Sequence, residues 1–214
     1  MSIRRGADWG RPVRAAAGAQ VIGSDAELAA VVGSSDGSGE PGELIVTGGD
    51  LHRTLGAPDR RDVTNAELVA FEIDLVRGVG VRPDGTEVAL LAVAHVVGLP
   101  VSRRRGVEAL WRGPSFVAAN AAFLGEANIG PRAHPGDGLL DVSWGELPRR
   151  DLRAARSRMR TGSHLPHPAI EERRASSWSA PEGTRYIVLC DGVEVGELRE
   201  IRLTVEPDAV VVAV

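Results

Sequence analysis

The chain has 214 residues, of which 43% are hydrophobic, so it can form one large or two small domains with a proper core. Its net charge of -4 argues against a general nucleic-acid binder, whose domain is usually basic. All 25 basic residues are arginine, which excludes a phosphate-loop lysine, a Schiff-base lysine and a lysine general base.

The single cysteine, Cys190, excludes an intramolecular disulfide and a multi-cysteine metal site. It ends the apolar run 186–190, so we expect a buried and unreactive thiol. No stretch approaches the roughly 18 consecutive apolar residues of a membrane span. The basic residues near the N-terminus are not followed by the apolar segment of a secretory signal. We therefore expect a cytoplasmic protein without a transmembrane segment.

Residues 1–58 predict a reduced α/β unit. Ser24 and Asp25 are good N-cap residues for a helix, and Gly56 and Pro58 end a second helix. A loop rich in serine, glycine and proline separates the two halves of this unit. The expected elements are a strand at 20–22, a helix at 24–33, a strand at 43–46 and a helix at 51–55.

Residues 59–214 predict a β-rich domain. The run Pro83-Asp84-Gly85-Thr86 is a strong hairpin turn, and residues 149–160 predict the one clear helix of this part. The expected strands cover residues 68–81, 87–97, 115–124, 185–190, 193–196, 200–205 and 209–214. We therefore expect an α+β protein in which a small α/β unit precedes a larger β-rich domain.

Residues 131–142, with the sequence Pro-Arg-Ala-His-Pro-Gly-Asp-Gly-Leu-Leu-Asp-Val, form the most informative motif. Asp137 and Gly138 lead directly into an apolar, strand-like segment that ends at Asp141. Such a loop presents a carboxylate and backbone carbonyls at a strand entrance, which suits a hard cation. The alternative is a tight Asp-Gly turn in which Asp137 caps its own backbone.

An ordered series of motifs resembles the C-terminal β-rich domain of the diacylglycerol kinase and sphingosine kinase superfamily, which includes the bacterial lipid kinases. The series comprises Asn120, Gly125, Gly130-Pro131, Asp137-Gly138-Leu139-Leu140-Asp141, Gly162-Ser163-His164, Pro168 and Asp191-Gly192. Upstream, residues 47–56 resemble that family's segment of glycine, asparagine and aspartate ahead of a leucine-glycine stop. The resemblance covers roughly residues 43–214 and implies a lipid-kinase-like antiparallel β-sandwich.

The resemblance also implies an ATP site, a structural magnesium ion and a general base. The residues that match by position are Thr47, Gly48, Gly49 and Asp50 on the nucleotide side, the Asp137 carboxylate with the carbonyls of His134 and Leu139 around Mg²⁺, and Glu194 or Asp191 as the base.

Two positions depart from the family pattern. The family's Gly-Gly-Asp-Gly-Thr phosphate loop has its best counterpart in the run 23–26, which keeps one glycine and Asp25, and the charges of Asp25 and Glu27 oppose an anion there. The family's base is a glutamate directly after the late Asp-Gly, where this chain has Val193. Glu194 is one residue further and points to the opposite face of a regular strand.

The expected helix at 149–160 carries six arginines. Its side chains predict either a solvated surface or a patch for anionic lipid head groups or an acidic partner. The arginines that share one stripe are Arg149, Arg153, Arg156 and Arg160. His164 and His167 lack the further partners of a zinc site, so we expect them to order their loop. His95 lies in an apolar strand and predicts a core histidine.

The leading hypothesis from the sequence is a diacylglycerol-kinase-like protein that phosphorylates a lipid hydroxyl from ATP, with weak or lost activity because its phosphate loop and base are altered. The alternative is a non-catalytic module of the same fold that binds a lipid, a nucleotide or a protein partner. A third reading is a homo-oligomer that pairs through an exposed strand edge.

Overall fold

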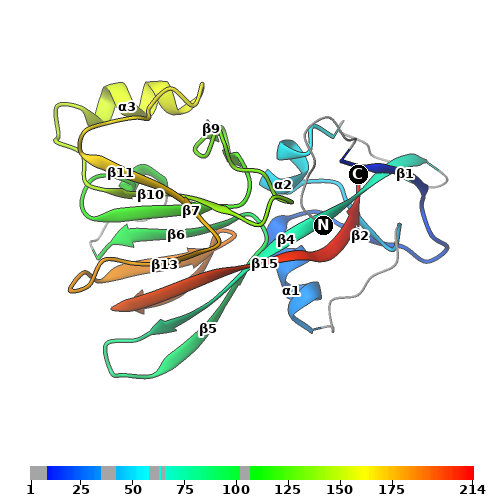
Figure 1. The fold of residues 1–214 in the computed structure, drawn as a ribbon, viewed down its shortest axis with the longest axis horizontal. Coiled ribbons are helices and arrows are strands. Elements are labelled where there is room, and N and C mark those ends of the chain that lie inside the picture. Colours follow the sequence, from blue (N-terminus) through cyan, green and yellow to red (C-terminus); the bar gives the residue numbers. More distant parts are fainter. Residues whose placement is uncertain (1–8, 35–41, 58–62, 64–65, 102–106) are drawn as a thin grey trace.

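The computed structural model describes residues 9–34, 42–57, 63, 66–101 and 107–214. Most of the loop expected after the first helix and the expected helix stop at Pro58 lie outside these residues. Two long strands, β4 (Glu67–Val81) and β15 (Glu200–Ala213), run through the middle of the molecule (Figure 1). They join a β-sandwich on one side to the helices α1 and α2 on the other.

The remaining elements follow the chain in short segments. They are β1 (Arg11–Arg14), β2 (Gln20–Ile22), α1 (Asp25–Ser34), β3 (Leu44–Val46), α2 (Gly49–Thr54), β5 (Glu87–Ala92), β6 (His95–Pro100), a 3₁₀ turn (Val107–Ala109), β7 (Ser115–Ala119), β8 (Phe123–Leu124), β9 (Ala127–Asn128), β10 (Leu140–Gly145), α3 (Leu152–Met159), β11 (Ile170–Ala175), β12 (Ser177–Ser179), β13 (Tyr186–Cys190) and β14 (Val193–Leu198).

Two large sheets form the molecule. The seven-stranded sheet has the order β1-β4-β15-β3-β2, with β5 added to β4 and β12 added to β15, and the six-stranded sheet has the order β11-β10-β7-β6-β13-β14. Within the described residues, two strand pairs of these sheets are parallel, β2–β3 and β3–β15, and the others are antiparallel. The expected β-rich architecture with a small α/β part is confirmed. The domain boundary expected at residue 58 stays a prediction. The strands β1 and β3, which precede residue 58, pair with β4 and β15, which follow it, in one sheet.

The sandwich core lies between the two sheets and is built on aromatic contacts. The ring of Phe116 lies 4.9 Å from that of Trp178 and 5.1 Å from that of Tyr186. Cys190 belongs to the same core, and burial raises the pKa of its thiol to about 12, as expected for an unreactive cysteine. Because large buried aromatic side chains contribute much of the burial free energy, this core fixes the two sheets against each other.

The helices cover other faces. Leu152 and Met159 of α3 pack on the outer face of the six-stranded sheet, and Leu28 of α1 and Leu51 of α2 pack beside β4 and β15. None of the described helices is long and apolar enough to cross a membrane. β1 and β2 lie at the ends of the main strand order, and pairing of two chains through such an edge stays a prediction.

Several expected elements have different limits. The strand expected at 87–97 is two strands, because the chain turns at Val93 and Ala94. The strand expected at 115–124 ends at Ala119, and the two strands expected after residue 200 are one strand with an irregular register between Glu206 and Val210. The 149–160 helix begins only at Leu152, after a turn. The sequence did not predict β1, β11 or β12, which are short and polar.

Candidate functional site

Asp25, at the first position of α1, holds the first turn of α2. Its Oδ2 accepts a hydrogen bond from the Asp50 amide at 2.6 Å, and its Oδ1 accepts one from the Leu51 amide at 3.1 Å. The cap of α1 is Ser24, whose hydroxyl accepts from the Glu27 amide at 3.2 Å. The expected cap is therefore confirmed for Ser24, whereas Asp25 stabilises a different helix.

The glycines of the nucleotide-side motif lie against this carboxylate. Gly49 has a φ of +96°, and a Cβ there would lie 2.4 Å from Oδ1 of Asp25. A Cβ on Gly48 would lie 2.5 Å from the carbonyl oxygen of Gly23. The Thr47 hydroxyl donates to the Ile22 carbonyl at 3.1 Å. Close packing of this segment on the β2–α1 turn thus accounts for both glycines without a bound phosphate.

Asp50 connects α2 to the sandwich. Its Oδ1 accepts from the Gly125 amide at 2.8 Å, and its Oδ2 lies 3.8 Å from Nδ1 of His95. His95 is buried, and its Nε2 donates to the Ala121 carbonyl at 3.0 Å. Burial lowers the pKa of His95 to about 4, so the ring is neutral at pH 7 and its Nδ1 carries no proton. The expected core histidine is confirmed.

Asp191 is bound by three consecutive backbone amides. Its carboxylate accepts from Val93 at 2.7 Å and from Ala94 and His95 at 2.9 Å each. Asp191 has a φ of +46°, which turns the chain after β13 and directs the side chain at the β5–β6 turn. Burial raises its pKa to about 6, although the three donors favour the ionised form. These contacts explain why the strand expected at 87–97 is broken.

Asp25, Asp50 and Asp191 form one group, which we call the aspartate cluster. Burial raises the pKa of Asp25 to about 7, and repulsion from Asp191 and Asp50 contributes to that shift. Burial also raises the pKa of Asp50. The cluster joins residues of α1, α2 and the β13–β14 turn, with His95 of β6 beside it. The sequence identified Asp50 and Asp191, but it did not predict that Asp25 and His95 would adjoin them.

Glu194 is not part of the aspartate cluster, and its side chain is exposed on the edge strand β14. The β13–β14 register is irregular: Val188 is opposite Gly196, but Leu189 is opposite Glu194. The irregularity thus follows Glu194 in the chain, and it does not bury this side chain. The role of Glu194 as a base stays a prediction.

The 131–142 loop is anchored by carboxylates. Asp137 Oδ1 accepts from the Leu139 amide at 3.0 Å, which is the self-capping turn considered from the sequence, and its Oδ2 contacts Arg174 of β11. Asp74 of β4 accepts from the Gly138 amide at 2.6 Å. His134 lies at the same loop, with its ring 4.2 Å from that of Trp9.

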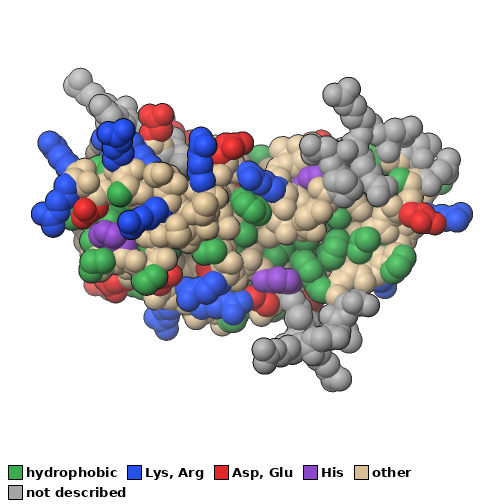
Figure 2. Space-filling model, turned by 90° about the horizontal axis from the view of Figure 1, so that it is seen from above, with side chains coloured by type: hydrophobic (Ala, Val, Ile, Leu, Met, Phe, Trp, Pro, Cys, Tyr) green, Lys and Arg blue, Asp and Glu red, His purple; other side chains and the backbone are tan. Residues whose placement is uncertain are grey.

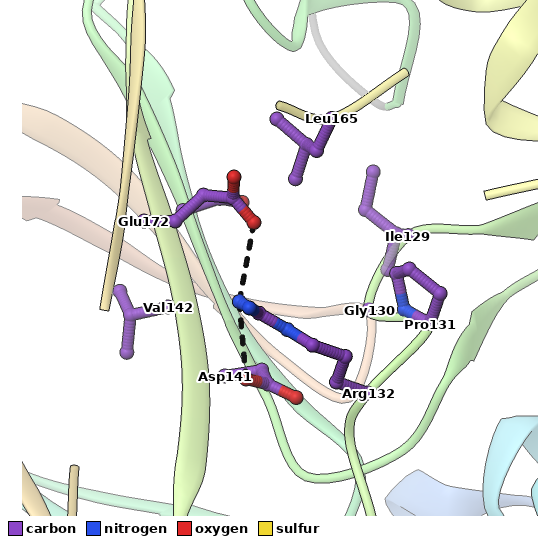
Figure 3. Close-up of a pocket in the computed structure, with 9 residues that line it drawn as sticks. Ile129, Gly130, Pro131, Arg132, Asp141, Val142, Leu165 and Glu172 are labelled. Carbon is purple, nitrogen blue, oxygen red and sulfur yellow. Dashed lines mark hydrogen bonds and ion pairs between the residues drawn. The ribbon is translucent and has the colours of Figure 1, made fainter. Parts of the chain in front are cut away.

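Arginines and carboxylates continue from this loop across β10 and β11. Figure 3 shows the Arg132 guanidinium between Glu172, at 3.2 Å, and Asp141, at 3.7 Å. Nε of Arg174 lies 3.8 Å from Oδ1 of Asp141, the same oxygen that Arg132 approaches. Both Asp141 oxygens are buried and lack a hydrogen bond. The adjoining cavity of about 20 Å³ has room for a single water molecule.

These contacts test the expected magnesium site. Both Asp137 oxygens already have a partner, and the positive charge beside them is the guanidinium of Arg174. Within the described ranges, no three His, Cys, Asp or Glu side chains converge as ligands for a metal ion. As they stand, these side chains do not fit Mg²⁺, whose ligands must complete an octahedron of oxygens. The metal role of Asp137, with the carbonyls of His134 and Leu139, stays a prediction.

The arginines of the expected surface patch surround α3. Arg149, Arg153 and Arg160 are exposed, and Arg156 contacts the carbonyl of Glu108. Figure 2 shows basic side chains prominently over the half of the molecule that carries α3. Nearby, Nδ1 of His167 accepts from the Ala169 amide at 3.1 Å, which orders this loop locally.

Comparison with known families matches residues 80–214 to the YegS C-terminal NAD kinase beta sandwich-like domain. The chain belongs to this family. The match covers most of the β-sandwich, including the 131–142 loop and the Asp191 turn, but not most of β4. The resemblance to the lipid kinase superfamily inferred from the sequence motifs is thereby confirmed.

Solved structures show the same fold. A candidate diacylglycerol kinase from Bacillus anthracis str. Sterne has 13% sequence identity and a TM-score of 0.58, over 90% of this chain and 76% of that chain. A diacylglycerol kinase structure from the same strain has 12% identity and a TM-score of 0.55, over 90% and 74%. A comparison with curated protein sequences gives no significant match. At such identities the structures share the fold alone, and function must be argued from the site.

Proposed function

We propose that this YegS-family chain acts as a binding module of the lipid kinase fold and has weak or no phosphotransferase activity. The observation that carries the proposal is the engagement of Asp191 by three backbone amides. A general base needs an oxygen directed at the hydroxyl that it deprotonates. Here the Asp191 oxygens are directed at the protein's own backbone, and Val193 occupies the position at which the family has its glutamate.

The nucleotide side supports the same conclusion. A phosphate cradle uses backbone amides that point at the ligand. The amides of Asp50 and Leu51 instead donate to Asp25, a carboxylate of the same chain. Two further carboxylates adjoin that position, and their charge opposes an approaching triphosphate.

A second candidate function is ATP-dependent phosphorylation of a lipid hydroxyl. The observation that favours it is the raised pKa of the aspartate cluster, since strongly shifted carboxyl groups gather at catalytic sites. In this alternative Thr47, Gly48, Gly49 and Asp50 would lie beside the nucleotide, and Glu194 or Asp191 would serve as the base.

The binding function would use the exposed arginines around α3. Anionic head groups attract arginine side chains, and α3 buries its own apolar residues in the core, so the contact would be electrostatic. Co-sedimentation should therefore retain the protein on vesicles that contain phosphatidylserine and not on phosphatidylcholine vesicles. Arg153→Glu combined with Arg160→Glu should release it, whereas retention of this variant would contradict the role of the patch.

The catalytic alternative is tested with radiolabelled ATP, magnesium and diacylglycerol vesicles. We expect no labelled lipid above background and no heat of ATP binding by calorimetry. Asp191→Asn and a matched change at the exposed hairpin, Asp84→Asn, separate the two functions. Labelled product that is lost in Asp191→Asn and kept in Asp84→Asn would refute the non-catalytic proposal.

A further inference from the structure

A groove opens where the chain crosses from one sheet of the sandwich to the other. β11 belongs to the six-stranded sheet and β12 to the seven-stranded sheet, and only Ser176 separates them. The space beside this crossing has a volume of about 520 Å³. We call it the tryptophan groove, and its characteristic residues are Trp144, Arg173, Ser177, Trp178, Arg202 and Thr204. None of them belongs to the aspartate cluster or the 131–142 loop.

Two indole rings form one wall of the groove. The rings of Trp144 and Trp178 lie 5.9 Å apart with an angle of 50° between their planes. Trp178 is held in turn by Phe116 in the sandwich core, and it is only 6% exposed. The core therefore holds Trp178 in place, and Trp144, which is only partly buried, offers the more accessible ring.

The charged residues that line the groove are both arginines, Arg173 and Arg202. Arg173 lies opposite Val142, two residues from Trp144 along β10, so both side chains are on the same face of the sheet. Arg173 makes no ion pair with any residue that the structure describes. Arg202 lies 3.3 Å from Glu200, but that carboxylate also pairs with Arg199 at 3.0 Å. The groove therefore carries an uncompensated positive charge.

The apolar surface is too small for an acyl chain. Leu203 is 1% exposed and Trp178 is 6% exposed, so both contribute little accessible hydrocarbon. The volume is nevertheless within the roughly 300–1,000 Å³ of typical small-molecule sites. An accessible indole, two guanidinium groups and the hydroxyls of Ser177 and Thr204 instead suit a planar ring that carries an anionic group.

We propose that the tryptophan groove binds a small aromatic anion, with its ring against Trp144 and its phosphate, sulfonate or carboxylate between Arg173 and Arg202. This site is separate from the aspartate cluster and from the arginines around α3, and it does not depend on the proposed function. The alternative role of Arg173 is to prevent the edge strand β11 from pairing with another chain, as inward-pointing charges do at sheet edges.

The test uses 1-naphthyl phosphate as the probe, with binding followed by calorimetry and by quenching of tryptophan fluorescence. We expect saturable binding at a single site. Inorganic phosphate, which lacks the ring, and 1-naphthol, which lacks the anion, should each bind about tenfold more weakly, because each loses either the aromatic contact or the charge-assisted hydrogen bonds.

Arg173→Gln should weaken binding of 1-naphthyl phosphate about tenfold or more, because it removes one charge-assisted contact. Trp144→Leu should weaken it as well, and Trp144→Phe should restore part of the loss. The matched control is Arg11→Gln, which changes an exposed arginine of β1 and should leave binding unchanged. Thermal unfolding of each variant confirms that it is folded.

Three results would overturn the proposal. One is the absence of saturable binding at millimolar probe. Another is binding that Arg173→Gln and Trp144→Leu leave unchanged, which would place the probe elsewhere. The third is an Arg173→Gln protein that self-associates but binds the probe as the unchanged protein does, which would assign Arg173 to protection of the strand edge.

Discussion

Replacing Asp25 by asparagine should stabilise the protein at high pH, although Asp25 makes two hydrogen bonds. Burial raises the pKa of Asp25 from 3.8 to about 7. Since one pKa unit corresponds to about 1.4 kcal/mol, ionised Asp25 costs the folded state on the order of 4 kcal/mol above pH 7. Asparagine has one carbonyl oxygen, so one amide of α2 loses its acceptor, at about 1–2 kcal/mol. The net gain is roughly 2 kcal/mol at pH 8.

The sign follows from proton linkage. The folded state binds a proton at Asp25 more tightly than the unfolded state, so this contribution is complete below pH 3.8 and is lost as the pH rises through about 7. The lowered pKa of His95 reduces the stability of the folded state in acid. Because His95 is present in both proteins, this effect largely cancels in the difference between their stabilities. Asp25→Asn should therefore have nearly the same stability as the unchanged protein at pH 4.

Urea unfolding followed by circular dichroism at pH 4, 6 and 8 measures this difference. The two stability curves should separate as the pH rises, with the variant above the unchanged protein. Parallel curves with Asp25→Asn lower at every pH would refute the reasoning, because they would mean that the α2 amides keep Asp25 ionised in the folded state.

The other predictions concern backbone contacts and charge. Gly49→Ala should lower the free energy of unfolding by more than about 2 kcal/mol, whereas Gly85→Ala, also at positive φ but in open space, should cost only about 1 kcal/mol; equal losses in urea would contradict the steric argument. Arg174→Gln should cost about 1 kcal/mol or less, because the guanidinium is partly exposed, and millimolar Mg²⁺ should raise the melting temperature of this variant only; calorimetry showing a magnesium effect on the unchanged protein would argue against the arginine's role. Asp191→Ala should cost about 3 kcal/mol or more and expose three amides to hydrogen exchange; retained protection would show that they have other acceptors.

Local patterns predicted much of the secondary structure. Ser24 capped a helix as expected, and the 83–86 turn joined two strands, with Gly85 donating to the Arg82 carbonyl at 2.9 Å. Alternation and apolar runs located most strands of the sandwich. The sequence did not predict the short polar strands β11 and β12. They are strands because they pair with β10 and β15, and their own composition does not favour a strand.

The amino-acid sequence by itself determined the β-rich architecture, the family and the identity of Asp50, Asp137 and Asp191 as residues of interest. Only the tertiary structure decided what these carboxylates do. Asp191 meets amides up to 98 positions away, and Asp137 meets an arginine 37 positions away. Local composition and spacing carry no signal for contacts at such separations. The motif residues that suggest catalysis therefore also accept the hydrogen bonds that the backbone amides of turns and helix ends in this fold require.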